Sequence, residues 1–193
     1  MIKGFPTRKD SIILAAIEII SESGIQGLST KKIAEKQGIS ESILYKHFNK
    51  LDDVLVAVIE YFSQFDSMIA NTVIEKDISC KDKILEYIKS FVELYEAYPA
   101  LACIILNYDV LMHYDHTHQM IIDIINNRLG FINKVIKMGQ EKGEISNYYT
   151  SQELTDIVKG IIFTVTLRWK MAGYTFQLKD RILLTIKKVL ENS

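Results

Sequence analysis

The chain has 193 residues, a formal net charge of −1 and 48% hydrophobic residues. This is enough apolar material for a sizeable core, which excludes a disordered chain. The apolar runs, such as residues 101–106, are too short to span a bilayer, and no charged start leads into an apolar signal segment. We therefore expect a cytoplasmic protein without a membrane partner. Cys80 and Cys103 are isolated and match neither metal-ligand nor disulfide spacing.

The charge is distributed unevenly along the chain. Residues 1–50 hold eight Lys or Arg and five acidic residues, a net charge of +3, which leaves −4 for the remainder. A basic end on an acidic body suits a protein that presents one end to phosphates. Many enzymes show a similar asymmetry, so the charge alone does not decide the function.

The first predicted helix begins after Thr7. This residue is a good N-cap, and Asp10 stands three positions later, where a capping box needs a carboxylate near the positive end of the helix. Isoleucine and alanine then recur at helical spacing, and Gly24 supplies the C-terminal stop.

Two further short helices are predicted before residue 50. One begins at Ser29 or Thr30, and Gly38 permits a tight turn after it because glycine adopts left-handed backbone conformations easily. Ser40 then caps a helix that we expect to run to about Phe48. This spacing is typical of a helix-turn-helix unit that reads DNA.

From Leu51 onward the hydrophobic pattern is helical almost without interruption. Strand-like alternation, hairpin signals and internal repeats are absent from the sequence, so we predict an all-α fold of about nine helices. The six helices expected in this part cover residues 51–75, 81–98, 100–112, 117–142, 151–172 and 178–190.

The N-terminal quarter resembles the tetracycline-repressor-type (TetR) family of transcriptional regulators. The resemblance rests on the run Ile39-Ser40-x3-Leu44-Tyr45-x-His47-Phe48, together with Thr30, Ile33, Ala34 and Gly38. It implies a three-helix DNA-binding domain in residues 1–50, and a larger helical domain in residues 51–193 that binds an effector and dimerises. It also implies a ligand-responsive regulator, most simply a repressor released from a palindromic operator in double-stranded DNA.

The predicted DNA-contacting residues lie on the second and third helices. Side chains on the side of the third helix away from Leu44 can reach base edges in the major groove, while hydroxyl, imidazole and ammonium groups suit phosphates. Tyr45 has a second interpretation, which is that it packs in the core beside Phe48. The expected DNA-binding set is Thr30, Lys31, Glu41, Ser42, Ile43, Tyr45, Lys46, His47 and Lys50.

Three positions depart from the family pattern. Leu51 stands where members usually carry a phosphate-anchoring lysine, and Lys50 is the candidate substitute one position earlier. Ser42 replaces a frequent glycine. Glu41 would repel phosphates unless it accepts a hydrogen bond from a cytosine amine, and it could equally be an acidic residue of the first helical turn.

The resemblance implies a homodimer built by the last two helices. The residues that provide more apolar surface than a single protomer normally exposes are Ile157, Ile161, Ile162 and Val165, together with the stripe of the last predicted helix, Ile182, Leu183, Ile186, Val189 and Leu190. The alternative is that they all face the protomer's own core. Two recognition helices about 34–36 Å apart would then read one palindrome.

Aromatic residues suggest where an effector could bind. Tyr87, Phe91, Tyr95 and Tyr98 share one helix face, and other aromatic residues could meet them across a cavity for an apolar or aromatic small molecule. The alternative is that they form ordinary core. The predicted ligand-binding set is Phe62, Phe65, Tyr87, Phe91, Tyr95, Phe131, Phe163 and Trp169.

A polar segment around His113, His116 and His118, with Asp109 and Asp115, could bind a divalent metal or simply connect two helices. We expect the connection, with no metal and no cofactor. Because paired carboxylates, nucleophile motifs and phosphate-binding glycine loops are absent from the sequence, we do not expect an enzyme. Two alternatives stay open: a DNA-associated protein-interaction module of the same fold, and a histidine-based metal-sensing or catalytic protein.

Overall fold

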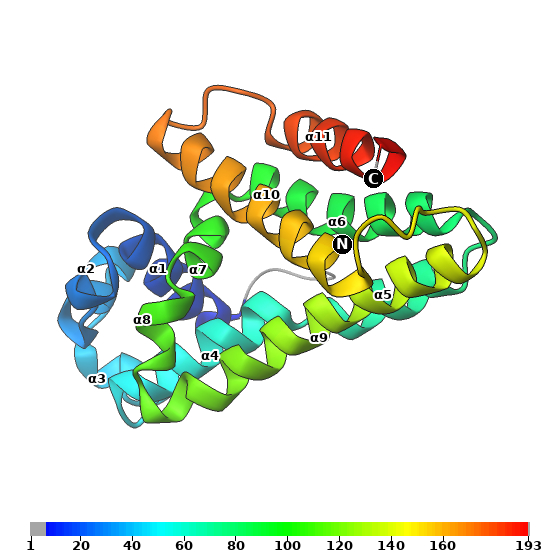
Figure 1. Ribbon diagram of the computed structural model, residues 1–193. Helices are drawn as coiled ribbons and strands as arrows, with labels where there is room; N and C mark the ends of the chain where they lie inside the picture. Colours follow the sequence, from blue (N-terminus) through cyan, green and yellow to red (C-terminus); the bar gives the residue numbers. More distant parts are fainter. Residues whose placement is uncertain (1–6, 193) are drawn as a thin grey trace. The chain divides into compact units, whose positions relative to one another are not determined.

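The computed structural model describes residues 7–192, which contain helices and no strand (Figure 1). The all-α prediction is therefore confirmed. The chain forms two compact units, and each unit is made of two separate segments of the chain. The first unit comprises the chain up to Gln64 together with Ala100–Ile122, and the second comprises Phe65–Pro99 together with the chain from Asp123 onward.

The first unit is built around α1, which packs on α2, α4 and α7. Its core side chains Ile12, Ala16 and Ile20 are fully buried, as the helical spacing predicted. The elements are α1 (Arg8–Ser23), the 3₁₀ turn η1 (Ile25–Gly27), α2 (Thr30–Gln37), α3 (Glu41–Leu44), α4 (Leu51–Ser63), the 3₁₀ turn η2 (Pro99–Ala102), α7 (Cys103–Leu106), α8 (Tyr108–Met112) and the first turns of α9 (Asp115–Glu141).

The predicted capping box at the start of α1 is present. The Thr7 hydroxyl accepts from the Asp10 amide at 3.2 Å, and the Asp10 carboxylate accepts from the Thr7 amide at 2.8 Å. These hydrogen bonds satisfy amides that have no partner inside the helix. The Thr7 hydroxyl also donates to the Asp10 carboxylate at 2.7 Å. This bond and the one from the Thr7 amide lower the pKa of Asp10 below its usual value, because both favour the charged carboxylate.

The prediction of one helix over residues 51–75 is wrong. Helix α4 ends at Ser63, and a separate helix α5 (Asp66–Ile74) follows it. The Gln64 side chain donates to the Tyr61 carbonyl at 2.8 Å, and Phe65 adopts φ −103° and ψ −3° at the break. The sequence pattern concealed the break because apolar residues continue at helical spacing across it.

The prediction of one helix over residues 100–112 is also wrong, because η2, α7 and α8 occupy this segment as short pieces. Asn107 separates α7 from α8, and its side-chain amide donates to the Cys103 carbonyl at 2.7 Å. An asparagine that bonds to the backbone in this way competes with a continuous helix.

The second unit contains α5, α6 (Cys80–Ala97), most of α9, α10 (Ser151–Met171) and α11 (Leu178–Asn192). Helix α6 packs against both α5 and α11, and α10 packs against α11. The boundaries of α6, α9, α10 and α11 lie within two residues of the predicted ones. Among the described residues, the search for a helix long and apolar enough to cross a membrane found none.

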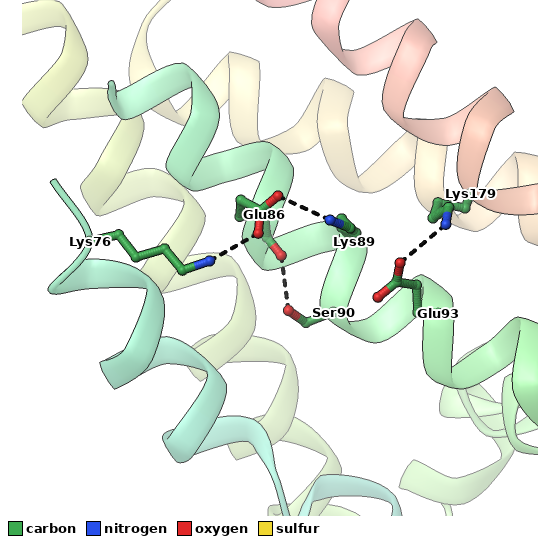
Figure 2. Close-up of polar contacts among 6 residues, drawn as sticks. All are labelled: Lys76, Glu86, Lys89, Ser90, Glu93 and Lys179. Carbon is green, nitrogen blue, oxygen red and sulfur yellow. Dashed lines mark hydrogen bonds and ion pairs between the residues drawn. The ribbon is translucent and has the colours of Figure 1, made fainter. Parts of the chain in front are cut away.

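Ion pairs fix the start of α11 on α6 (Figure 2). The Lys179 ammonium lies 3.1 Å from the Glu93 carboxylate, and the Lys179 amide donates to Glu96 at 3.0 Å. Further along α6, Glu86 accepts from Lys76 at 3.0 Å and from Lys89 at 3.3 Å, which lowers the pKa of Glu86. The Lys179 contacts therefore hold the start of α11 against α6, while Glu86 ties α6 to the segment after α5.

Candidate DNA-binding and effector sites

A glycine turn sets the direction of α3 relative to α2. Gly38 has φ 62° and ψ 34°, a left-handed conformation that costs other residues energy. The Ile39 amide donates to the Ala34 carbonyl at 3.0 Å, which closes the turn. A Cβ atom at Gly38 would meet nothing within 4 Å, so the requirement for glycine is conformational and not one of space.

Helix α3 packs on a small apolar core. Ile33 and Leu44 are completely buried, and Phe48 is 4% exposed with the Lys9 ammonium 5.5 Å from its ring centre. The prediction that the third helix reaches Phe48 is wrong, because it ends at Leu44. The Lys46 and His47 amides bond to carbonyls only three residues back, at 3.2 and 2.9 Å, so the chain continues as a tighter turn.

This tight turn presents three of the predicted DNA-contacting side chains to solvent. Tyr45 is 48% exposed, which favours a contact with DNA over the core-packing interpretation. Lys46 and His47 are exposed as well. The remaining members of the set divide into exposed residues (Lys31, Ser42 and Lys50) and half-buried residues (Thr30, Glu41 and Ile43).

The first residues of α2 and α3 are joined by a hydrogen bond. The Thr30 hydroxyl donates to Glu41 Oε2 at 2.6 Å. Thr30, which sequence reasoning assigned to a phosphate, therefore has a protein acceptor, and Glu41 has a fixed orientation. A capping bond from the Lys32 amide to the Ser29 hydroxyl, 3.2 Å long, completes the start of α2.

The lysines of this surface differ in how far their charge is neutralised. Lys36 lies 3.2 Å from Glu18 and 2.9 Å from Glu22, and these hydrogen bonds to carboxylates raise its pKa. Lys31 lies 4.0 Å from Glu35 and its side chain is 76% exposed, so this pairing has little energetic consequence. Lys46 makes no ion pair within the described residues, so its charge is available for a phosphate.

Lys50 forms a polar cluster inside the first unit. Its ammonium lies 2.8 Å from His116 Nε2 and 3.3 Å from Asp52 Oδ2. The Asp53 carboxylate accepts from the Asn49 and Lys50 amides at 2.9 and 3.3 Å and caps α4, which explains the acidic residues at this helix start. To contact a phosphate in place of the lysine that family members carry at the position of Leu51, the Lys50 ammonium must break its contacts with His116 and Asp52.

The three histidines do not come together. The ring of His113 bonds to the Asp109 carbonyl at 2.7 Å, the ring of His118 bonds to the Met112 carbonyl at 2.7 Å, and His116 faces Lys50. Among the described residues, no group of three His, Cys, Asp or Glu side chains is placed to hold a metal ion. The geometry therefore gives the metal-sensing alternative no support.

Three residues of the predicted ligand-binding set meet in the second unit. Tyr87 stacks on Phe131 with ring centres 4.1 Å apart and meets Phe91 edge-on at 5.0 Å. Tyr95 lies on the same helix and is 3% exposed. Burial raises the pKa of both Tyr87 and Tyr95, because a phenolate would be poorly solvated there.

A buried ion pair that the sequence analysis missed lies at this aromatic cluster. The Arg128 guanidinium binds both oxygens of Asp66 at 2.7 and 2.8 Å, donates to the Tyr95 hydroxyl at 3.1 Å and lies 4.3 Å from the centre of the Phe91 ring. Both side chains of the pair are about 15% exposed or less. The available signal was the position of Arg128 on the apolar face of α9, four residues before Ile132.

The other members of the predicted ligand set lie elsewhere. Phe62 belongs to the first unit and meets Tyr108 edge-on at 6.1 Å, while Phe65 is half-buried at the break between α4 and α5. Trp169 is buried, and its indole donates to the Phe176 carbonyl at 2.9 Å. Phe163 is 43% exposed on α10.

One surface of the last two helices is unusually apolar. On α10, Phe163, Leu167 and Met171 are 43%, 39% and 78% exposed, and Leu184 on α11 is 57% exposed. The four residues predicted at a dimer interface, Ile157, Ile161, Ile162 and Val165, are half-buried. On α11, Ile182, Ile186 and Leu190 are buried within the protomer, so for these three the prediction of an exposed dimer surface is wrong.

A helix-turn-helix unit with an exposed basic and aromatic turn, attached to a second all-helical unit, defines a class of DNA-binding transcriptional regulators. A family model described as "Bacterial regulatory proteins, tetR family" matches residues 12–58, and one described as "YsiA-like protein, C-terminal region" matches residues 58–191. The chain belongs to the TetR family of transcriptional regulators, and the resemblance seen in its sequence is confirmed. It is a ligand-responsive, DNA-binding regulator.

Individual relatives agree with this assignment. The fatty acid metabolism regulator protein of Bacillus subtilis is 24% identical over 168 residues, which are 86% of each chain. The crystal structure of FadR from Bacillus subtilis in complex with stearoyl-CoA has a TM-score of 0.76 at 22% identity and covers 94% of this chain and 97% of that one. The ketosteroid regulator KstR2 of Mycobacterium tuberculosis has a TM-score of 0.84 at 15% identity, covering 97% and 95%. These structural likenesses show the shared fold.

Proposed function

We propose that this protein is a homodimeric repressor that binds a palindromic operator in the cytoplasm and is released by a small hydrophobic effector. Residues 1–50 read the DNA, and residues 51–193 bind the effector and dimerise. The activity is binding and release, without a catalytic step. The observation that carries the proposal is the turn after α3, where Tyr45, Lys46 and His47 are exposed directly above the buried Leu44.

The chemistry of this turn fits duplex DNA. The Tyr45 hydroxyl and the His47 imidazole are hydrogen-bonding groups for phosphate oxygens, and the Lys46 ammonium adds a charge that displaces a counterion. Contacts of this kind position α3 so that its first residues face base edges in the major groove. Operator affinity is therefore expected to fall steeply as the salt concentration rises.

The apolar surface of α10 and α11 supports the proposed dimer. Exposed side chains such as Phe163, Leu167 and Met171 would be covered by the same surface of a second copy, as a two-fold interface requires. A two-fold dimer also matches the proposed operator, because each half of a palindrome would receive one recognition helix.

A fatty-acyl thioester is the effector class we propose. The Bacillus subtilis relative is named for fatty acid metabolism, and FadR from that organism was crystallised with stearoyl-CoA. In the second unit of this chain, Tyr87, Phe91 and Phe131 form an aromatic cluster beside the Arg128 guanidinium. Apolar rings with a few polar groups are typical of sites for such ligands.

Release requires the effector to favour the conformation that binds DNA poorly. Shifting a two-state equilibrium from 1:99 to 99:1 takes a difference in effector affinity of about 10⁴-fold, or about 5.5 kcal/mol. We propose that the effector acts on the segment around Asp66, which directly follows the end of α4 and is held by Arg128.

Selection from genomic DNA tests the operator proposal. Purified protein is incubated with sheared DNA from its source at physiological salt, and the retained fragments are sequenced. Enrichment of one or a few palindromes is the expected result. Featureless retention by ligand-stripped protein would contradict the proposal and favour a function other than operator recognition.

An anisotropy titration on the selected operator tests the effector. Stearoyl-CoA is expected to release the labelled DNA, while coenzyme A alone and stearate serve as controls for the two halves of the molecule. If none of the three changes the operator affinity but the palindrome is still selected, the acyl-thioester proposal is wrong and the DNA-binding proposal stands.

A further inference from the structure

The hydrogen bond between α2 and α3 gives Glu41 properties that its neighbours lack. Glu41 is the first residue of α3, and its Oε2 atom accepts from the Thr30 hydroxyl at 2.6 Å. Its Oε1 atom has no partner among the described residues, and no lysine or arginine there forms an ion pair with Glu41. The carboxylate is therefore oriented by one hydrogen bond, has no cationic partner among these residues and has one oxygen available.

The neighbouring polar side chain is occupied locally. The Ser42 hydroxyl lies 2.7 Å from the Ser40 hydroxyl, and the two groups share one hydrogen bond. Ile43 is apolar and half-buried. Among the residues predicted to reach base edges (Glu41, Ser42, Ile43 and Lys46), Glu41 thus offers a free acceptor that a hydrogen bond to α2 holds in place.

The chemistry of a carboxylate limits which base it can read. An ionised carboxylate only accepts hydrogen bonds, and the donors in the major groove are the cytosine N4 and adenine N6 amines. In adenine the N7 acceptor lies beside the amine and would repel the carboxylate, whereas in cytosine the neighbouring group is a C–H. Cytosine is therefore the base that a fixed glutamate favours.

We propose that Glu41, oriented by Thr30, selects cytosine at one position in each half of the operator. This inference rests on the proposed function. Thr30 is then a positioning residue, and its hydroxyl serves Glu41 instead of a phosphate. The free carboxylate lowers the affinity for all DNA because it repels phosphates. On operators that present the cytosine amine, a hydrogen bond to this amine recovers part of the lost binding free energy.

The test compares base preferences of full-length dimers on a pool of operators randomised at each position in turn. The wild-type protein is expected to prefer cytosine about tenfold or more at one position of each half-site, within the range for single mismatches. Glu41→Ala should lose this preference alone and bind unrelated DNA more tightly. Glu41→Gln should move the preference toward adenine, which a glutamine amide reads with two hydrogen bonds.

Thr30 variants test the positioning role. Thr30→Val keeps the carboxylate and removes the donor, so the cytosine preference should weaken, and Thr30→Ser should restore it. Lys31→Ala is the matched control, expected to reduce affinity and its salt dependence without changing any base preference. Circular dichroism and sedimentation establish that each variant is folded and dimeric.

The outcomes separate this inference from the function on which it rests. If the wild-type protein selects a palindrome but Glu41→Ala shows the same preference at every position, Glu41 is only a first-turn acid, and the inference is overturned while the proposed function stands. If the wild-type protein selects no palindrome, the proposed function fails and the inference fails with it.

Discussion

The DNA-reading surface and the aromatic cluster of the second unit are built in opposite ways. The predicted DNA contacts all lie between Thr30 and Lys50, and most of their side chains are exposed. The cluster around Arg128 draws its members from α5, α6 and α9, and its side chains are buried or half-buried. A site made from one short segment depends on local turn and capping chemistry, whereas a site made from distant segments depends on packing.

This difference predicts how each region responds to mutation. An exposed side chain that contacts only DNA can be removed without loss of stability, so binding and folding should separate in the first unit. A buried charge that loses its partner destabilises the fold, so binding and folding should change together in the second unit.

The largest expected effect is the loss of operator binding in the double variant Tyr45→Ala, Lys46→Ala. Removal of a phosphate-contacting hydroxyl and a free cation from the exposed turn is expected to weaken specific binding by at least about 100-fold, on the scale of two base-pair mismatches. Anisotropy with the selected operator measures the affinity, and the melting temperature and dimer should remain unchanged.

A matched pair in the second unit controls for the loss of a tyrosine and a lysine. Tyr148, which is 79% exposed, and the exposed Lys142 both lie between α9 and α10. Tyr148→Ala, Lys142→Ala should bind the operator like the wild-type protein. Survival of operator binding in the Tyr45, Lys46 variant would show that the turn after α3 is not the reading surface.

The next largest effect concerns stability in the second unit. Arg128→Met leaves the Asp66 carboxylate buried without its cation, at an expected cost of about 3–5 kcal/mol in the free energy of unfolding. Asp66→Asn combined with Arg128→Met should recover part of this loss, because it also removes the unpaired charge. Chemical denaturation of the four members of this double-mutant cycle measures the coupling.

An exposed pair on α11 provides the contrast for the buried one. Lys187 and Glu191 are 3.8 Å apart and roughly half exposed, and their pairing is worth a few tenths of a kcal/mol. Lys187→Ala should therefore be nearly neutral. Equal losses from Lys187→Ala and Arg128→Met would mean that burial of the Arg128 pair has no energetic consequence.

Smaller effects on stability, of opposite sign, are expected for two glycine-to-alanine substitutions. Gly38→Ala forces a left-handed conformation on alanine and should destabilise the protein by about 1–2 kcal/mol. Gly130→Ala, within α9 and with nothing within 4 Å of its Cβ, should instead stabilise it by about 0.5–1 kcal/mol. Thermal denaturation measures both, and a neutral Gly38→Ala would contradict the conformational requirement in the turn.

The smallest effect is the pH dependence of the α1 cap. The pKa of Asp10 is lowered in the folded protein by its hydrogen bonds to Thr7, so the cap contributes stability above the unfolded pKa of about 3.9. This contribution disappears as the pH falls through the lowered folded value. The melting temperatures of the wild-type protein and Asp10→Asn should differ at pH 7 and converge once the pH lies below the lowered folded pKa, and a constant difference would exclude this origin.

The sequence predicted the parts of the structure that local chemistry decides. The capping box at Thr7 and Asp10 and the glycine turn at Gly38 appear where they were expected. The break after Ser63 was missed because no proline or glycine marks it and apolar residues continue at helical spacing across it.

The second unit shows where sequence reasoning stops. The contact between Tyr87 and Phe131 was expected as a possibility, but the pairing of Arg128 with Asp66 joins residues 62 positions apart and no periodicity indicates it. Phe163 fits an apolar helix pattern equally well on an exposed and on a buried face. Tertiary packing, which the pattern does not contain, decides between them.

The turn between α10 and α11 has a practical consequence for spectroscopy. Trp169 is the single tryptophan of the chain, and its indole is 3% exposed, bonds to the Phe176 carbonyl and meets the Tyr174 ring at 4.7 Å. Its fluorescence therefore reports on this helical hairpin alone, while far-ultraviolet ellipticity sums over every helix. Melting curves followed by the two signals coincide only if the α10–α11 hairpin unfolds in the same cooperative transition as the helices of the first unit.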